Sequence, residues 1–88
     1  MEGIKKRERY PISSPEFLAE FRKKLAERLE FKYPLEEAGA TDVPDKIREG
    51  VKFPSDSWTG DACAAVANEE YRMWPDEYEE LRSIILSD

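Results

Sequence analysis

Residues 13–31 read SSPEFLAEFRKKLAERLEF, and this stretch sets the architecture of the 88-residue chain. Either Ser13 or Ser14 can cap the N-terminus of a helix, and Pro15 suits the first helical turn. Apolar residues then recur at spacings of three and four, which places them on one stripe of a helix. The stripe consists of Phe17, Leu18, Phe21, Leu25 and Leu29. The pattern therefore predicts a long amphipathic helix.

The C-terminal end of this helix is marked by a proline. Pro34 biases Tyr33 away from helical backbone geometry, so we expect the helix to cover residues 14–32. The polar face of the helix is basic, because several cations lie off the apolar stripe. They are Arg22, Lys23, Lys24, Arg28 and Lys32.

The middle of the chain is rich in turn-forming residues and predicts only one short helix. Pro44 suits the first turn of this helix and Gly50 provides the stop, which places it near residues 43–49. The alternation of residues 51–53 resembles a strand. Three residues without a second strand cannot form a sheet, however, so we expect an extended loop there.

Two further helices are predicted near the C-terminus, over residues 60–74 and 75–86. Thr59 is a suitable cap for the first, and small and apolar residues recur along it at helical spacing. Pro75 cannot continue a helix interior but suits the first turn of a new helix, so it separates the two. The last helix has an apolar stripe made of Tyr78, Leu81, Ile84 and Ile85.

These elements predict an all-α fold with a single domain over residues 1–88, in which three main helices form a small bundle and a loop-rich middle segment wraps over them. Residues 1–12 show neither helical nor strand periodicity, and we expect an extended basic arm. The predicted core combines the apolar stripes. It consists of Phe17, Leu18, Phe21, Leu25, Leu29, Ile47, Trp58, Val66, Met73, Trp74, Tyr78, Leu81 and Ile85.

The composition argues against enzyme chemistry. The chain has no histidine, which removes the commonest general base and a common metal ligand. Its one cysteine, Cys63, lies among small apolar residues, as a buried structural thiol does. The four glycines match neither a dinucleotide-binding motif nor a P-loop. We therefore expect no enzyme activity, no catalytic residue, no cofactor and no bound metal.

The sequence carries no sign of a membrane or secretory segment. No apolar run approaches the length of a membrane span, and the N-terminal residues lack the pattern of a signal peptide. One cysteine cannot form a disulfide within its own chain, which is typical of a reducing compartment. We expect a cytoplasmic, intracellular protein that does not contact a membrane.

Charge is divided unevenly along the chain. Residues 1–32 hold nine Lys or Arg and six Asp or Glu, a net charge of 9 − 6 = +3. Residues 33–88 hold five and fourteen, which gives 5 − 14 = −9. A molecule polarised in this way can steer a partner of opposite charge.

The first of three functional hypotheses is a small acidic protein-interaction module. Its carboxylates bind a basic surface of a larger, nucleic-acid-handling protein, in the manner of inhibitors from phages and other mobile elements. The acidic face consists of Glu69, Glu70, Asp76, Glu77, Glu79 and Glu80. The competing interpretation is a solvated helix face without a partner. If the face binds, reversing Glu77, Glu79 and Glu80 to Lys weakens binding and leaves thermal stability nearly unchanged.

The second hypothesis is a nucleic-acid-binding accessory protein. Cations of the arm and of the first helix contact phosphates, and Tyr10 stacks on a base. These cations are Lys5, Lys6, Arg7, Arg9, Arg22 and Lys23. The acidic remainder of the chain opposes this hypothesis, because it repels a polyanion.

The third hypothesis is a homo-oligomer that sequesters a small ligand, such as a nucleotide, between its copies. The side chain of Tyr10, Trp58, Tyr71 or Trp74 stacks on a ring of the ligand, and the N-terminal cations hold its phosphates. The competing interpretation makes Trp58 and Trp74 anchors of the core.

Overall fold

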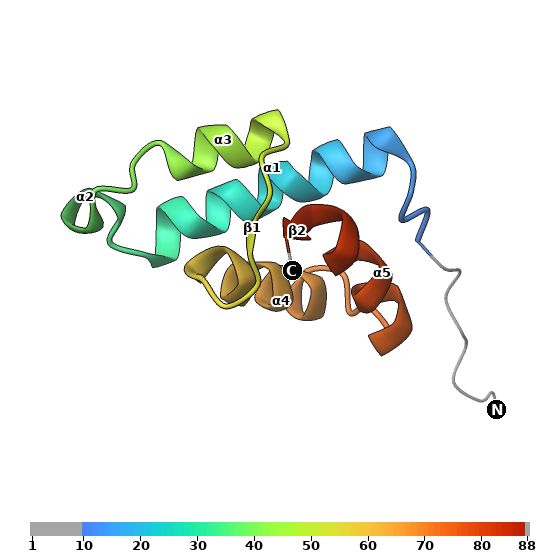
Figure 1. Ribbon diagram of the computed structural model, residues 1–88. Coiled ribbons are helices and arrows are strands. Elements are labelled where there is room, and N and C mark those ends of the chain that lie inside the picture. The colour runs from blue at the N-terminus through green and yellow to red at the C-terminus, as the bar shows by residue number, and fades with distance from the viewer. Residues whose placement is uncertain (1–9, 88) are drawn as a thin grey trace, which may run out of the picture.

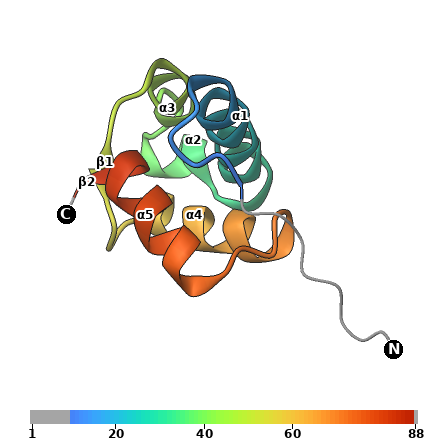
Figure 2. The same ribbon diagram turned by 90° about the vertical axis from the view of Figure 1, so that its right-hand side faces the viewer.

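Five helices build the part of the chain that the computed structural model describes, which is residues 10–87 (Figure 1). In chain order the elements are α1 (Pro15–Lys32), α2 (Leu35–Ala38), α3 (Val43–Glu49), β1 (Phe53–Pro54), α4 (Trp58–Glu69), α5 (Pro75–Ile85) and β2 (Leu86–Ser87). Figure 2 shows two layers, with α1 and α3 in one and α4 and α5 in the other. The predicted all-α class is confirmed, with one pair of very short strands added.

Helix α1 forms as the sequence predicts. The Oγ atom of Ser14 accepts a hydrogen bond from the N–H of Phe17 at 3.5 Å, and Pro15 is the first helical residue. Tyr33 is extended (φ −121°, ψ 146°), as expected for a residue that precedes Pro34. The whole predicted stripe is buried, and α1 packs against α3 and α4 (Figure 1). This helix is therefore the element that joins the two layers.

Glycine ends both short helices. In α3 the N–H of Val51 donates to the carbonyl of Lys46 at 3.0 Å, and the N–H of Gly50 donates to that of Ile47 at 3.0 Å. These two bonds make a Schellman motif, in which Gly50 has the left-handed backbone conformation (φ 98°). Helix α3 has its predicted bounds. Helix α2 is not among the predicted elements, although it ends in the same way at Gly39 (φ 68°).

A two-stranded parallel pair closes the fold at one edge. Phe53 pairs with Leu86 and Pro54 pairs with Ser87, so β1 and β2 lie side by side (Figures 1 and 2). The prediction of an unpaired extended loop at residues 51–53 is wrong for Phe53. Its partner strand, β2, is the last described segment of the chain. Because β2 begins at Leu86, helix α5 ends at Ile85, one residue before the predicted end of the final helix. No local pattern marks a pairing over so long a separation.

Helix α4 begins and ends earlier than predicted. Its N-cap is Ser57 and not Thr59, which lies inside the first turn and is buried. The helix stops at Glu69, five residues before the predicted end at residue 74. Arg72 has a left-handed backbone (φ 52°), and the N–H of Met73 donates to the carbonyl of Ala67 at 3.0 Å. The chain therefore turns back here, and Met73 is buried in the core although it does not belong to a helix.

The start of α4 depends on a close approach of two backbone segments. A Cβ atom at Gly60 would overlap the carbonyl oxygen of Ser55. The hydroxyl of Ser57 donates to the carbonyl of Pro54 at 2.6 Å, which tightens the turn between β1 and α4. A residue without a side chain is therefore required at position 60 for the turn at Ser55 to pack this closely against the start of α4.

One core connects the helices of both layers. Ten of the thirteen predicted core residues are buried, and they include members of α1, α3, α4 and α5. Trp74 and Tyr78 are half-buried, and Trp58 is 37% exposed, so the prediction of Trp58 as a core anchor is wrong. Trp58 instead stacks on Tyr33 at the surface, with ring centroids 5.4 Å apart.

The last residues of the predicted arm belong to the folded body. Ile12 is buried in the core, and Tyr10 packs against it. The cations Lys5, Lys6, Arg7 and Arg9 lie outside the described residues. An extended arm over all of residues 1–12 is therefore incorrect for residues 10–12.

Candidate functional site

Five of the six predicted acidic-face residues are on the surface. Glu69 and Glu70 lie at the C-terminal end of α4, and Asp76, Glu79 and Glu80 are exposed on α5. A short segment, residues 71–74, connects the two groups.

Glu77 is the sixth residue, and it does not belong to this surface. Its side chain is 1% exposed. One carboxylate oxygen, Oε1, accepts the N–H of Trp74 at 3.0 Å, which caps the first turn of α5. The other, Oε2, accepts the N–H of Tyr10 at 2.9 Å. The carboxylate of Glu77 therefore links the backbone at Tyr10 to the first turn of α5, and it is not accessible to a partner protein.

Tyr10 is occupied within the fold in the same way. Its ring stacks on Phe17 with centroids 5.5 Å apart and meets the edge of Tyr71 at 5.3 Å. Its hydroxyl donates to the carbonyl of Tyr71 at 2.7 Å. One face of the ring that the second and third hypotheses require for a ligand is therefore in contact with Phe17.

Among the aromatic residues of the third hypothesis, Trp58 is also distant from Tyr10 and Tyr71. Tyr10 and Tyr71 contact Phe17 in the first turn of α1, whereas Trp58 contacts Tyr33, which follows its last turn. An α-helix rises about 1.5 Å per residue, so the length of α1 separates the two groups. The structure therefore does not bring Trp58 into one pocket with Tyr10 and Tyr71 within a single chain.

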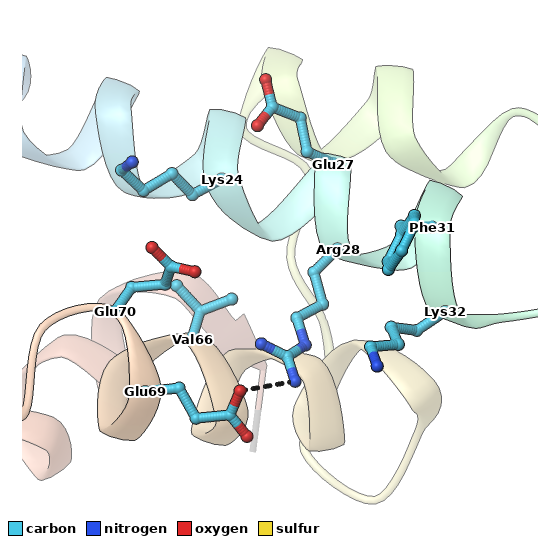
Figure 3. A pocket seen from close by; sticks show the side chains of 8 residues that line it. All are labelled: Lys24, Glu27, Arg28, Phe31, Lys32, Val66, Glu69 and Glu70. Carbon is cyan, nitrogen blue, oxygen red and sulfur yellow. Dashed lines mark ion pairs between the residues drawn. The ribbon is translucent and has the colours of Figure 1, made fainter.

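A charged cleft lies between α1 and α4 (Figure 3). Its volume is about 330 Å³, and it is lined by Lys24, Glu27, Arg28, Phe31, Lys32, Val66, Glu69 and Glu70. Arg28 and Glu69 form an ion pair across it at 2.8 Å. Lys24 and Glu70 project from its opposite walls (Figure 3). The basic face of the first helix therefore meets part of the predicted acidic face, and the two partly neutralise each other.

Arg22 and Lys23, the other predicted contacts on α1, do not line this cleft. Lys23 is exposed and Arg22 is half-buried. The four remaining cations of the nucleic-acid hypothesis lie outside the described residues, so the described part of the chain does not assemble a continuous basic face from the predicted set.

Phe31 belongs to this cleft and is not among the site residues predicted from the sequence. Its side chain is 83% exposed, although it follows the buried Leu29 by only two residues on α1. The ammonium of Lys32 lies 5.5 Å from the centroid of its ring. The sequence feature that indicates its exposure is its position outside the apolar stripe of the helix. Such a residue faces solvent once the stripe faces the core.

A second concave region lies where α1 ends and α4 begins. The stacked rings of Trp58 and Tyr33 stand beside a pocket of about 170 Å³. We call it the Trp58 pocket, and it is lined by Leu29, Leu35, Val43, Phe53, Ser57, Trp58 and Thr59. Nearly all of this lining is apolar.

An acidic cleft adjoins the Trp58 pocket. Its volume is about 410 Å³, and it is lined by Glu30, Tyr33, Pro34, Leu35, Glu36, Glu37 and Thr41. Leu35 lines both this acidic cleft and the Trp58 pocket. Three carboxylates and no cation belong to the lining of the acidic cleft. Glu30 is engaged by Arg48 at 3.2 Å, whereas Glu36 and Glu37 are exposed in α2.

No known protein family, curated protein or solved structure matches this chain.

The described residues offer no metal centre. No group of three or more His, Cys, Asp or Glu among residues 10–87 could hold a metal ion. Cys63 is fully buried, and its burial raises the pKa of the thiol to about 12, against weaker opposite effects of Tyr78 and Arg82. The thiol is therefore protonated at neutral pH and a poor nucleophile.

None of the helices within residues 10–87 has the length and apolar character needed to cross a membrane.

Proposed function

We propose that this chain is a small protein-interaction module without enzymatic activity, which binds a basic surface of a larger protein and blocks it. The observation that carries the proposal is the exposed ring of Phe31 at the α1–α4 cleft. Aromatic residues and arginine dominate the energetics of protein interfaces. A ring that is 83% exposed at a cleft is well placed to anchor such an interface.

Charge indicates the kind of partner. Residues 10–87 hold ten Lys or Arg and seventeen Asp or Glu, a net charge of 10 − 17 = −7. Glu79 and Glu80 add exposed carboxylates on α5, and Glu70 adds one at the end of α4. Negative charge on the molecule attracts a basic partner before contact, which raises the association rate and makes it sensitive to salt.

Phe31 supplies the expected energetic anchor. Burial of a phenylalanine side chain contributes about 1.5–3 kcal/mol. Phe31→Ala is therefore expected to weaken partner binding by about tenfold or more, since about 1.4 kcal/mol corresponds to a factor of ten. Folding stability should change little, because the ring already contacts water over most of its surface.

Site-specific photo-crosslinking tests the proposal directly. A photoreactive phenylalanine analogue replaces Phe31 in the full chain, which is expressed in the cells that contain it naturally. The matched control carries the same analogue at Val51, which is also exposed (45%) but lies beyond α3, outside the α1–α4 cleft. We expect one discrete adduct with a basic protein from position 31 and none from position 51. Equal adducts from both positions, or none from position 31, would contradict the proposal.

A charge reversal provides the second arm of the test. Glu79→Lys with Glu80→Lys should reduce the adduct yield, and the effect should fade at high salt. Glu77 must be left out of this reversal, because its carboxylate is buried and holds two backbone N–H groups. The triple reversal that the sequence suggests would confuse loss of binding with loss of folding.

A further inference from the structure

The Trp58 pocket has the size and lining of a receptor for one apolar side chain. Apolar cavities of about 150 Å³ accommodate a molecule as large as benzene. The Trp58 pocket measures about 170 Å³, its lining is almost entirely apolar, and Leu29, Leu35, Val43 and Phe53 belong to it. A leucine, isoleucine or phenylalanine side chain therefore fits in volume and in chemistry.

Trp58 gives this pocket an exposed aromatic edge. The indole is 37% exposed and is held against the ring of Tyr33, with an angle of 29° between the ring planes. Ser57 and Gly60 fix the turn that carries it, through a hydrogen bond and a close backbone contact. The aromatic wall is therefore preorganised, which lowers the entropic cost of binding.

The acidic cleft next to the Trp58 pocket identifies the charge of the ligand. Glu36 and Glu37 are exposed, and both line this cleft, which shares Leu35 with the pocket. Glu30 is already engaged by Arg48, so Glu36 and Glu37 are the carboxylates best able to take a new cation. A ligand that fills the pocket and continues past Leu35 meets this negative charge, which excludes phosphates and favours Lys or Arg.

We propose that the Trp58 pocket and the acidic cleft together bind a linear segment of a partner protein. One apolar side chain of the segment fills the Trp58 pocket, and a Lys or Arg within the next few residues contacts Glu36 and Glu37. This inference rests on the proposed function, because it names the partner chemistry of a protein-binding module. It uses a surface separate from Phe31 and α5, so the two can fail independently.

Fluorescence anisotropy of a labelled peptide tests the inference with the full chain. The probe contains one leucine followed by three lysines between glycine and serine spacers. Replacing the leucine by serine, or the lysines by glutamates, should weaken binding at least about tenfold. Glu36→Lys with Glu37→Lys should have a similar effect at low salt. The matched control, Glu16→Lys with Glu20→Lys, adds the same charge at exposed positions near the start of α1, outside the pocket and the acidic cleft, and should stay within about twofold.

A second measurement needs no variant that might fail to fold. The two tryptophan indole N–H signals are resolved by ¹H–¹⁵N NMR during titration with the same peptide. The signal of Trp58 should shift while that of Trp74, which lies outside the pocket lining, stays in place. Trp58→Ala should weaken binding about tenfold or more, with folding checked by circular dichroism.

Several results would overturn the inference. They are no binding up to about 1 mM peptide, equal binding of the leucine-free peptide, and a shift of Trp74 without Trp58. Self-association of the chain that the peptide displaces would assign the pocket to a second copy. If the position-31 adduct forms while the peptide fails, only this inference is lost. If the peptide binds while no position-31 adduct forms, the proposed docking face is lost.

Discussion

Replacement of Glu77 by glutamine should destabilise the fold far more than any exposed carboxylate replacement. The change keeps the size of the side chain and removes its charge. Each carboxylate oxygen of Glu77 accepts one backbone N–H, from Trp74 at 3.0 Å and from Tyr10 at 2.9 Å. A glutamine retains one acceptor oxygen and presents an amide donor where the second acceptor stood.

The magnitude follows from the number and type of bonds. A hydrogen bond to a charged group contributes about 1.5–3 kcal/mol. Glu77→Gln loses one such bond and weakens the other, so we expect a loss of about 2–3 kcal/mol in the free energy of unfolding. Glu77→Ala removes both acceptors and should cost about 3–6 kcal/mol. A domain of this length has a stability of about 4–13 kcal/mol, so the alanine variant approaches complete unfolding.

Urea denaturation provides the measurement. Unfolding is followed by tryptophan fluorescence and by circular dichroism, and coincident transitions establish two-state behaviour. The matched control is Glu80→Gln, the same change on the exposed side of the same helix, which should stay within about 0.5 kcal/mol. The melting temperature should fall by about 8–24 °C for Glu77→Gln. Hydrogen exchange at the amides of Tyr10 and Trp74 should accelerate beyond the global effect.

Equal stability of the Glu77→Gln and Glu80→Gln variants would refute this reasoning. It would mean that the buried carboxylate contributes no more than a solvated one. Faster exchange at Trp74 alone would limit the role of Glu77 to capping α5.

Four further substitutions test the packing. The hydroxyl of Tyr71 is buried without a hydrogen-bond partner among residues 10–87, so Tyr71→Phe should raise the free energy of unfolding by about 1 kcal/mol. Tyr10→Phe removes the 2.7 Å hydrogen bond from the Tyr10 hydroxyl to the carbonyl of Tyr71, so it should lower the free energy of unfolding by about 1 kcal/mol. Gly50→Ala should cost about 1–2 kcal/mol in thermal unfolding, because Gly50 has φ 98° and no atom nearby to compensate. The pKa of Cys63 is raised to about 12 from 9.0, so its stabilising contribution is complete below pH 9 and falls as pH rises from 9 toward 12. Cys63→Ala should flatten this alkaline loss, and the wild-type thiol should react with a disulfide reagent only in denaturant.

The controls for these changes lie in the same assays. An unchanged or lower stability of Tyr71→Phe would indicate that a water molecule satisfies the hydroxyl. A Gly50→Ala variant as stable as the parent would contradict the left-handed assignment. Rapid modification of Cys63 in the native chain would show that its surroundings open readily.

The helices that could be predicted are those with local start and stop signals. Ser14 and Pro15 begin α1, and Pro34 ends it, all by contacts within a few residues of chain. Gly50 ends α3 by the same kind of local bond. The predicted end of α4 is wrong because Met73 continues the apolar period. The spacing of apolar residues predicts that a side chain is buried. It does not distinguish a helix from a turn that returns the residue to the core.

The candidate site could be predicted only in part. Exposure of Glu79 and Glu80 follows from their place on an amphipathic helix. Burial of Glu77 does not, because one of its donors, Tyr10, lies 67 residues earlier in the chain. The ion pair between Arg28 and Glu69 likewise depends on which helix packs on α1. Charge counts along the chain therefore described a polarity that packing partly cancels.

Local chemistry alone was enough to specify a helical chain without histidine, with one protected thiol and a long first helix whose apolar stripe faces inward. Caps, prolines and spacing act over one or two helical turns, so they are visible in the residues themselves. Contacts between distant segments were not. Only packing could expose Trp58, bury the carboxylate of Glu77 and set the acidic cleft beside an apolar pocket, because each of these depends on partners brought together by the whole fold.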